Sequence, residues 1–492
     1  MDRLVVDDIE IDGRAGQSVR IEGGVIRDVG PLGTVAEIDE PIETIDGNGG
    51  ALIPGLHDHH THLFALAARL GSLWCGPPEV TRAAELLERL GEAGGEGWIR
   101  AVGWDDTVAG WPDRDLLDTA VADRPVRLQH RSGAMWVLNS AALALLDLGD
   151  ASEIPAGVET DHRGRPTGRI SGLDSWMRER IGGSVPDLAA VSAALAARGV
   201  TGVTDATAHN GAEELASLAA ARARGELVQR VTAMTASPDT AAVGDVELGP
   251  VKIVLFDPAL PSMAALVSAI VAAHAAGRAV AIHAASRVTV VLSVMALAEA
   301  GATAGDRIEH ASVVAPELLE PIAVLGVSVV TQPHFVAESG DRYLETVEAA
   351  DLPFLYRCRT LLDAGIALAA GSDAPVGRWD PWLNIEAAVE RLTASGKVVG
   401  DQERLSPEQA LALYTTSPWA PGGPPRPVEP GAPADLCLLD RPWSAARANL
   451  AAVGVRATMV EGRLVHHDPA SSSTSPHSSA VRASSRSPDN AR

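Results

Sequence analysis

The stretch PGLHDHHTHL, residues 54–63, places four histidines and one aspartate within six consecutive positions. It continues the apolar segment GALI, which is typical of a strand buried in a parallel sheet. Successive side chains of a strand point to opposite faces, so we expect Asp58, His60 and His62 to share one face. Parallel α/β folds bind their ligands at the carboxyl ends of the strands. The stretch therefore predicts a polar site where a buried strand ends.

Strand-like and helix-like segments alternate from about residue 190 to 375. The strand-like segments are GVTGVTDAT (199–207), QRVTAMTAS (229–237), GPVKIVLFD (249–257), RAVAIHAAS (278–286), DRIEHAS (306–312), GVSVVTQPHF (326–335) and GIALAAGSDAP (365–375). Ala- and Leu-rich segments such as AALVSAIVAAHAAG lie between most of them. With the strand that ends in HDHHTHL they make eight, and this alternation predicts an α/β fold, a (β/α)8 TIM barrel.

The remaining segments predict three further parts of the chain. Short alternating segments near both ends, such as VRIEGGVIRDVG and VGVRATMVEGRLVHH, predict one small β-sandwich domain built from both termini. A long insertion follows the first barrel strand and is expected to cover the barrel mouth, and a Ser-rich tail is expected to be disordered. The predicted boundaries are 1–52 and 416–466 for the β-sandwich, 53–70 and 190–415 for the barrel, 71–189 for the insertion and 467–492 for the tail.

The composition excludes several classes of partner. The 492 residues include 64 acidic and 40 basic ones, a formal net charge of −24, which argues against binding to nucleic acid. The three cysteines lie far apart, and we find neither a secretory leader nor an apolar run of membrane-spanning length. We therefore expect a cytoplasmic protein with a small-molecule substrate and no membrane partner. Whether the chain forms a homodimer stays open.

Polar side chains gather where the predicted barrel strands end. They are His60, His62, Lys252, His283, His310, His334 and Asp373. One histidine at such a place is more often structural than functional. Several imidazoles and a carboxylate at one rim are costly to remove from water unless another group pairs with them. A divalent cation does so, and neutral imidazole with carboxylate suits zinc or a neighbouring transition metal. The sequence therefore predicts a metal site at the barrel mouth.

Several of these motifs resemble a known superfamily. PGLHDHHTHL, AIHA, IEHAS, GSDAPV and EPGAPADLCLLD are similar to motifs of the amidohydrolase superfamily of metal-dependent hydrolases. GWDDTVAGWP, DRPVRLQHRSGAMWVLNSAAL, GVTGVTDA, YRCRTLLDAGIALAAGSDAPV and DPWLNIEAAV resemble its YtcJ-like, amidohydrolase-3 branch. The likeness runs from about residue 4 to 465. It implies a β/α barrel with a small β-sandwich formed by both termini.

The resemblance implies a role for most of the polar residues. Its metal ligands would be His60, His62, His283, His310 and the strand-eight carboxylate Asp373. Asp58 is expected near the metal, where it would accept a hydrogen bond from a ligand histidine. Lys252 is expected to be carboxylated and to bridge two cations, the alternative being an ordinary salt bridge. The expected cofactor is thus a divalent metal, zinc by preference, with two ions if Lys252 is carboxylated and one otherwise.

The expected reaction is hydrolysis of a non-peptide carbon–nitrogen bond, in a linear or cyclic amide or in an N-acyl or N-formyl amine. A metal-activated water would attack the carbonyl, with Asp373 first as general base and then as general acid. His334 would either hydrogen-bond the substrate oxyanion or be structural. Two alternatives stay open, namely an ester or lactone hydrolase with the same residues and a metal-binding barrel that binds its ligand without turnover.

Departures from the family pattern narrow the range of expected substrates. Ser286 stands where deaminases of the superfamily carry a glutamate proton shuttle, which argues against deamination of aromatic bases. Arg287 stands where an acid is expected, so either the substrate is anionic or Arg287 forms a salt bridge. In the insertion, Trp104, Trp111 and Trp136 would either line a pocket for an apolar group or form the core of that domain.

Overall fold

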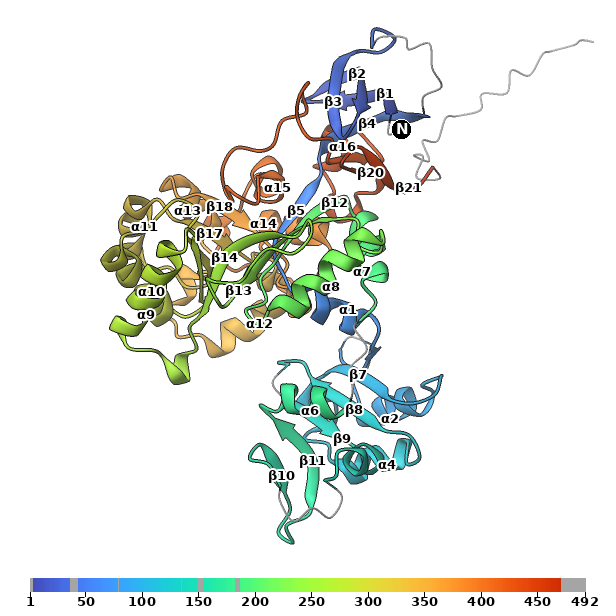
Figure 1. The fold of residues 1–492 in the computed structure, drawn as a ribbon, viewed down its shortest axis with the longest axis vertical. Coiled ribbons are helices and arrows are strands. Elements are labelled where there is room, and N and C mark those ends of the chain that lie inside the picture. The colour runs from blue at the N-terminus through green and yellow to red at the C-terminus, as the bar shows by residue number, and fades with distance from the viewer. Residues whose placement is uncertain are drawn as a thin grey trace, which may run out of the picture.

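The computed structural model describes residues 3–35, 43–77, 79–133, 135–148, 154–181 and 186–469. Apart from residues 467–469, the tail predicted to be disordered lies outside these ranges. Figure 1 shows three lobes: a barrel in the middle, a β-rich lobe made from the two ends of the chain above it, and the insertion below it.

The middle lobe contains the eight predicted parallel barrel strands, with helices between most of them. Its strands are β5 (Leu56–Thr61), β12 (Val200–Asp205), β13 (Arg230–Thr235), β14 (Glu247–Val254), β15 (Val280–Ala284), β16 (Arg307–His310), β17 (Ser328–Thr331) and β18 (Leu368–Ala370). They pair in parallel in the order β18-β17-β16-β15-β14-β13-β12-β5, as an eight-stranded sheet that curls into a nearly closed barrel.

The barrel closes where β18 meets β5. The backbone N–H of Asp373 donates to the carbonyl of His60 at 2.6 Å, and that of His62 donates to the carbonyl of Ala374 at 2.9 Å. A Cβ atom on Gly371 would lie 2.3 Å from the backbone nitrogen of His60, so only glycine permits this approach. The polar ends of the first and last barrel strands are thereby brought together.

Helices cover the outside of the barrel. They are α1 (Leu63–Leu70), α7 (Leu188–Ala196), α8 (Ala212–Ala223), α9 (Met263–Ala275), α10 (Arg287–Ala300), α11 (Leu319–Leu325), α12 (Phe335–Thr346), α13 (Cys358–Asp363), α14 (Pro381–Glu390) and α15 (Pro407–Thr415). No helix lies in the described segment between β13 and β14. The main apolar core lies between these helices and the strands and is rich in Leu, Ile, Val and Ala. Burial of this apolar surface drives the folding of the barrel.

The two ends of the chain form a second sheet. Its strands are β1 (Arg3–Ile11), β2 (Arg14–Glu22), β3 (Val25–Pro31), β4 (Glu43–Pro54), β19 (Leu436–Leu439), β20 (Val455–Val460) and β21 (Arg463–His467), and a short helix, α16 (Trp443–Ala446), follows β19. The order is β21-β20-β19-β4-β1-β2-β3. One apolar cluster takes side chains from both halves of this sheet. The assignment of this lobe as a β-sandwich stays a prediction.

The insertion has its own sheet and its own cores. Its strands are β6 (Leu73–Trp74), β7 (Ile99–Trp104), β8 (Val126–His130), β9 (Met135–Leu138), β10 (Val158–Thr160) and β11 (Pro166–Ser171), and its helices are α2 (Ala83–Gly91), α3 (Asp106–Ala109), α4 (Arg114–Ala120), α5 (Ser140–Leu145) and α6 (Asp174–Ile181). Trp104 and Trp136 are buried in these cores, whereas Trp111 is 58% exposed. The core alternative thus holds for the first two tryptophans. The predicted domain boundaries, and the expectation that the insertion covers the barrel mouth, remain predictions.

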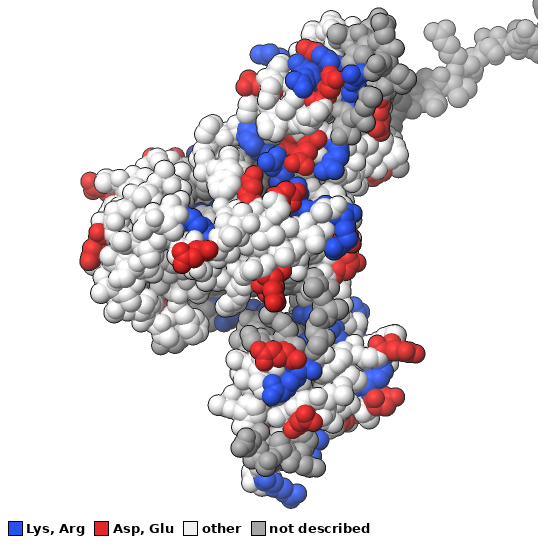
Figure 2. All heavy atoms as spheres, in the orientation of Figure 1, with Lys and Arg blue, Asp and Glu red and all other residues white. Residues whose placement is uncertain are grey.

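The surface carries both signs of charge. On the face drawn in Figure 2, acidic and basic residues are interspersed rather than gathered by sign. Among the described helices, none combines the length and the apolar character that a membrane crossing requires. Cys75, Cys358 and Cys437 are buried as free thiols, as expected for a chain without a disulfide framework.

Candidate metal centre

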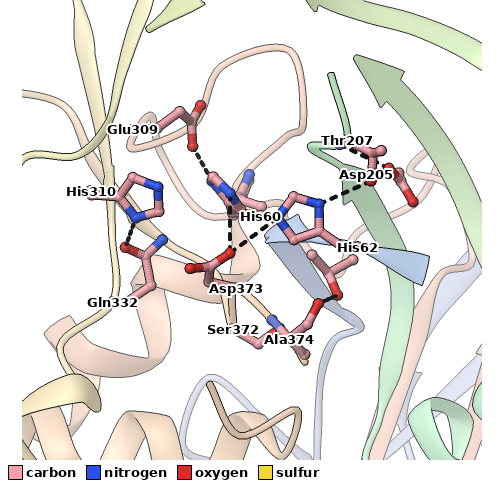
Figure 3. Close-up of polar contacts among 12 residues, drawn as sticks. His60, His62, Asp205, Thr207, Glu309, His310, Gln332, Ser372, Asp373 and Ala374 are labelled. Carbon is pink, nitrogen blue, oxygen red and sulfur yellow. Dashed lines mark hydrogen bonds and ion pairs between the residues drawn. The ribbon is translucent and has the colours of Figure 1, made fainter. Parts of the chain in front are cut away.

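Two imidazoles and a carboxylate converge where β5 and β18 end. The Oδ1 atom of Asp373 lies 3.1 Å from Nε2 of His62 and 3.5 Å from Nε2 of His60 (Figure 3). One ligand atom from each of the three residues can be chosen so that all lie within 4.8 Å of one another. Two ligands of a tetrahedral zinc ion, each about 2.1 Å from it, would lie about 3.4 Å apart. This spacing therefore suits a shared cation.

The other nitrogen of each of these imidazoles has a partner of its own. His60 donates from Nδ1 to the buried carboxylate of Glu309, and Nδ1 of His62 lies 2.9 Å from the hydroxyl of Thr207. The Glu309 carboxylate can only accept, so it fixes the tautomer of His60, whereas the Thr207 hydroxyl can donate or accept and fixes only the direction of the His62 ring. Both rings are thereby held with Nε2 turned toward Asp373.

His283 and His310 extend the cluster around the rim. The His310 ring lies 4.8 Å from the His60 ring and 4.3 Å from the His283 ring, measured between ring centroids. His310 donates from Nδ1 to Oε1 of Gln332 at 2.7 Å, which leaves its Nε2 free as a metal ligand. Burial lowers the pKa of His310, and it lowers the pKa of His283 to about 3. Both imidazoles are therefore neutral at physiological pH, as metal binding requires.

Lys252 lies inside the barrel on β14 and is 5% exposed. Its Nζ has no hydrogen-bond partner among the described residues, and no described carboxylate lies within salt-bridge distance. Burial lowers the pKa of its amine, which favours the neutral form. Because Nζ has no partner among the described residues, this structure does not contain the ordinary salt bridge, and the lowered pKa favours the neutral form that carboxylation requires.

Asp58 does not bond a ligand imidazole. Its Oδ1 accepts the backbone N–H groups of His60 at 3.1 Å and of Ser372 at 2.9 Å, so it joins the ends of β5 and β18 instead. Burial raises its pKa to about 6 despite these bonds. The acceptor for His60 is Glu309, which is fully buried and paired with Arg307 at 2.5 Å. The expectation for Asp58 was wrong because the carboxylate on β16 reaches the imidazole across the barrel.

His57 and His59 lie apart from the metal cluster. Nε2 of His57 bonds the hydroxyl of Thr204 at 2.9 Å, and Nε2 of His59 bonds that of Thr416 at 3.0 Å. Burial lowers the pKa of both rings well below the ordinary value. The two neutral rings lie 4.6 Å apart between centroids, and each is hydrogen-bonded to its own threonine. This agrees with their absence from the ligand motif.

His334 is buried at the start of α12. Its Nε2 lies 3.1 Å from the carbonyl oxygen of Ser372, and a carbonyl can only accept, so Nε2 donates. Burial lowers its pKa to about 4, so the ring is neutral and its Nδ1 is an acceptor. The one N–H of this ring is thus used to hold the backbone beside Asp373. Its predicted role toward a substrate oxyanion remains a prediction.

Asp373 is ionised in this setting. Burial raises its pKa, but the hydrogen bond with His62 and the neighbouring imidazoles outweigh burial and bring the pKa well below the ordinary value. Its backbone φ is +50°, and that of His310 is +69°, in the left-handed region that residues other than glycine rarely adopt. Backbone strain of this kind is concentrated at functional sites.

The similarity to known proteins agrees with this geometry. A family model described as "Amidohydrolase family" matches residues 43–466, which is most of the chain. The chain belongs to the amidohydrolase family. As a member of the amidohydrolase family the protein is a hydrolase, and the predicted resemblance to this family is confirmed.

Curated relatives and a solved structure support the assignment. The putative amidohydrolase YtcJ of Bacillus subtilis is 27% identical over 82% of this chain and 86% of its own length. The N-substituted formamide deformylase of Arthrobacter pascens is 26% identical over 91% of this chain and 94% of its own. An uncharacterized metal-dependent hydrolase from Pyrococcus furiosus is 25% identical, with a TM-score of 0.71 over 89% of this chain and 99% of that one. The similarity of this amidohydrolase to these three proteins thus extends over most of its length.

The two departures from the amidohydrolase pattern have structural explanations. Ser286 caps α10, since its Oγ accepts the backbone N–H of Thr289 at 3.2 Å. Arg287 forms ion pairs with Glu317 at 2.6 Å and with Asp351 at 3.2 Å, which confirms the salt-bridge alternative. Both side chains are thus used in contacts within the protein, and these contacts do not direct either of them toward a substrate in the barrel.

Two partners of the predicted ligands were missed from the sequence. Glu309 stands inside the short strand RIEH, and Gln332 follows the apolar run SVVT. A charged residue in a strand that is buried on both faces requires a buried partner, and this was the available signal for Glu309. An amide at the end of a strand is common, so Gln332 carried no comparable signal.

Proposed function

We propose that this amidohydrolase hydrolyses a non-peptide carbon–nitrogen bond in a small amide, an N-acyl amine or an N-formyl amine. The observation that carries the proposal is the convergence of His60 and His62, whose Nε2 atoms lie 3.5 Å and 3.1 Å from Oδ1 of Asp373 while their Nδ1 atoms contact Glu309 and Thr207. Anchored imidazoles beside a carboxylate suit a divalent cation such as zinc. We assign His60, His62, His283, His310 and Asp373 to hold it.

A divalent cation bound there supplies Lewis acidity, which makes water more acidic and a carbonyl more electrophilic. Asp373 is the proton carrier of the proposed reaction, because it is an ionised carboxylate beside the imidazoles that would hold the cation and can accept a proton from water there. It then returns that proton to the leaving nitrogen, so the amine departs neutral. Oδ1 of Asp373 lies 3.1 Å from Nε2 of His62, so the carboxylate stands beside an imidazole that would share the cation with it.

Lys252 decides the number of ions in this proposal. Its buried Nζ lacks a hydrogen-bond partner among the described residues, and a carboxylated amine would provide two further oxygen ligands. We therefore favour two cations with a carboxylated Lys252, and one cation if the amine stays unmodified. Elemental analysis of freshly purified protein gives both the identity and the number of the ions.

The amide class has three rivals: deamination, ester or lactone hydrolysis, and binding without turnover. Ser286 caps a helix where a deaminase would need a proton-shuttling glutamate, and the relative named N-substituted formamide deformylase acts on a formamide. An ester or lactone hydrolase would use the same residues, and a non-catalytic binder would need Asp373 only as a metal ligand and not as a proton carrier. The class of the scissile bond is thus the main point to test.

A panel of N-formyl and N-acetyl amines, each with its matched formate or acetate ester, tests the proposal on metal-loaded protein. We expect turnover of amides that is lost in Asp373→Asn. Turnover of the esters alone would overturn the proposed bond class. Bound metal without turnover of any panel member would favour the non-catalytic alternative.

A further inference from the structure

Gln332 has a side-chain donor without a partner beside the metal centre. Its Oε1 accepts the hydrogen bond from Nδ1 of His310 at 2.7 Å. Its Nε2 has no hydrogen-bond partner in the described part of the chain, although the residue is 0% exposed. A buried amide nitrogen without an acceptor is costly and rare in native structures. Such a donor indicates an acceptor that arrives with a ligand.

The position of Gln332 is set by strand order. It follows β17 directly, and β17 lies between β16, which ends in His310, and β18, which leads into Asp373. The neighbouring strands are joined at this level, since the hydroxyl of Thr331 donates to the carbonyl of His310 at 2.8 Å. Figure 3 shows the Gln332 amide beside His310, with its nitrogen turned to the side on which Asp373 lies.

The orientation of the amide follows from the role of His310. An imidazole that binds a cation through Nε2 carries its proton on Nδ1, so its neighbour must present an oxygen. Oε1 of Gln332 therefore faces His310, and the NH₂ group takes the opposite direction. The alternative flip would set two donors against each other at 2.7 Å.

We propose that Gln332 donates this free N–H to the carbonyl oxygen of the substrate as that oxygen becomes negative during hydrolysis. The proposal rests on the proposed function, because it assumes attack by water on a carbonyl. As the oxygen of water bonds to the carbonyl carbon, the π pair moves onto the carbonyl oxygen, and Asp373 takes the proton. The pair then re-forms the carbonyl, the C–N bond breaks, and the proton passes to nitrogen.

Gln332 is better placed for this role than His334. The only N–H of the neutral His334 ring donates to the carbonyl of Ser372, so it is already used. The Gln332 donor has no competing acceptor among the described residues. Oriented donors of this kind are typically worth about 10²- to 10³-fold in kcat.

Two substitutions separate catalysis from the support of His310. Gln332→Glu keeps an acceptor for His310 and nearly the same shape but removes the donor. Gln332→Met removes both groups without adding charge. We expect both variants to lose about 10²- to 10³-fold in kcat with KM nearly unchanged. Gln332→Glu should keep the metal content of the wild type, whereas Gln332→Met should bind metal about 10- to 100-fold more weakly.

The readouts distinguish the proposal from its rivals. Near wild-type kcat in metal-loaded Gln332→Glu would overturn it. Loss of metal from Gln332→Glu in proportion to its loss of activity would also overturn it, because Gln332 would then act only through His310. If the wild type cleaves only esters, the proposed bond class fails. The role of Gln332 is then decided by comparing the kcat of the wild type and of Gln332→Glu on the ester, because an ester carbonyl oxygen gains the same charge.

Discussion

Replacing Glu309 with glutamine tests how the barrel interior supports the metal centre. The substitution keeps the size of the side chain and removes its charge. Glu309 is 0% exposed, accepts the Nδ1 hydrogen bond of His60 and lies 2.5 Å from the guanidinium of Arg307. Arg307 is itself 1% exposed, and its other hydrogen-bond contacts are the carbonyl of His59 at 3.2 Å and the sulfur of Met234 at 3.8 Å. Glu309→Gln therefore leaves a buried cation without its anion.

The expected cost has two parts. Removing one partner of a buried ion pair typically lowers the free energy of unfolding by about 3–5 kcal/mol. Removing the charged acceptor of a ligand histidine typically weakens metal binding by about 10- to 100-fold. Burial raises the pKa of Glu309, but the charge of Arg307 and contact with His60 outweigh it, so the pKa lies well below the ordinary value. The carboxylate is thus charged in the wild type at all working pH values.

Two measurements on matched variants test this reasoning. Urea unfolding followed by circular dichroism gives the stability, and titration of apoprotein with zinc gives the affinity. The control is Glu317→Gln, which breaks the ion pair with Arg287 at a side chain that is 61% exposed. We expect less than about 1 kcal/mol from the control and no change in its metal affinity. Equal stability losses in the two variants, or wild-type zinc affinity in Glu309→Gln, would refute the assignment of Glu309.

Three further predictions concern the ligands and the buried histidines. Asp373→Asn should lower kcat by about 10³-fold or more with metal content nearly unchanged, and loss of metal instead would show that Asp373 is chiefly a ligand. His60→Ala should lose both bound metal and turnover, and an unaltered metal stoichiometry in elemental analysis would contradict its assignment. Burial lowers the pKa of His59, so the folded protein keeps this ring neutral while the unfolded chain takes up a proton below about pH 6.5. Stability is therefore lost as pH falls, by about 1.4 kcal/mol per pH unit for this group, and in urea unfolding His59→Asn should show a pH dependence that is shallower by that amount.

Much of the barrel was predictable because its signals are local. A buried parallel strand needs an apolar run, and the run ends where polar side chains reach the rim, so GVTGVTDAT, RAVAIHAAS and DRIEHAS each mark a strand and its end. Helix boundaries follow from similar local chemistry, such as the Ser286 cap of α10. The ligand-type residues His283, His310 and Asp373 were found in the same way.

The partners of those residues were not predictable, because hydrogen bonds between strands depend on register and on barrel closure. Alternation placed Asp58 on the face of His60, yet its carboxylate accepts the backbone N–H groups of His60 and of Ser372, a residue that only barrel closure brings near. Glu309 bonds His60 across 249 positions of sequence, and nothing in either segment specifies that distance.

The amino-acid sequence by itself determined the number of barrel strands, the kinds of side chain at their ends and the family to which the chain belongs. Only the tertiary structure decided which nitrogen of each imidazole is free, that Lys252 lacks a hydrogen-bond partner among the described residues, and that Gln332 holds a spare donor beside Asp373. Strand formation depends on neighbours along the chain, whereas the direction of a buried hydrogen bond depends on groups that become neighbours only when β5 and β18 meet.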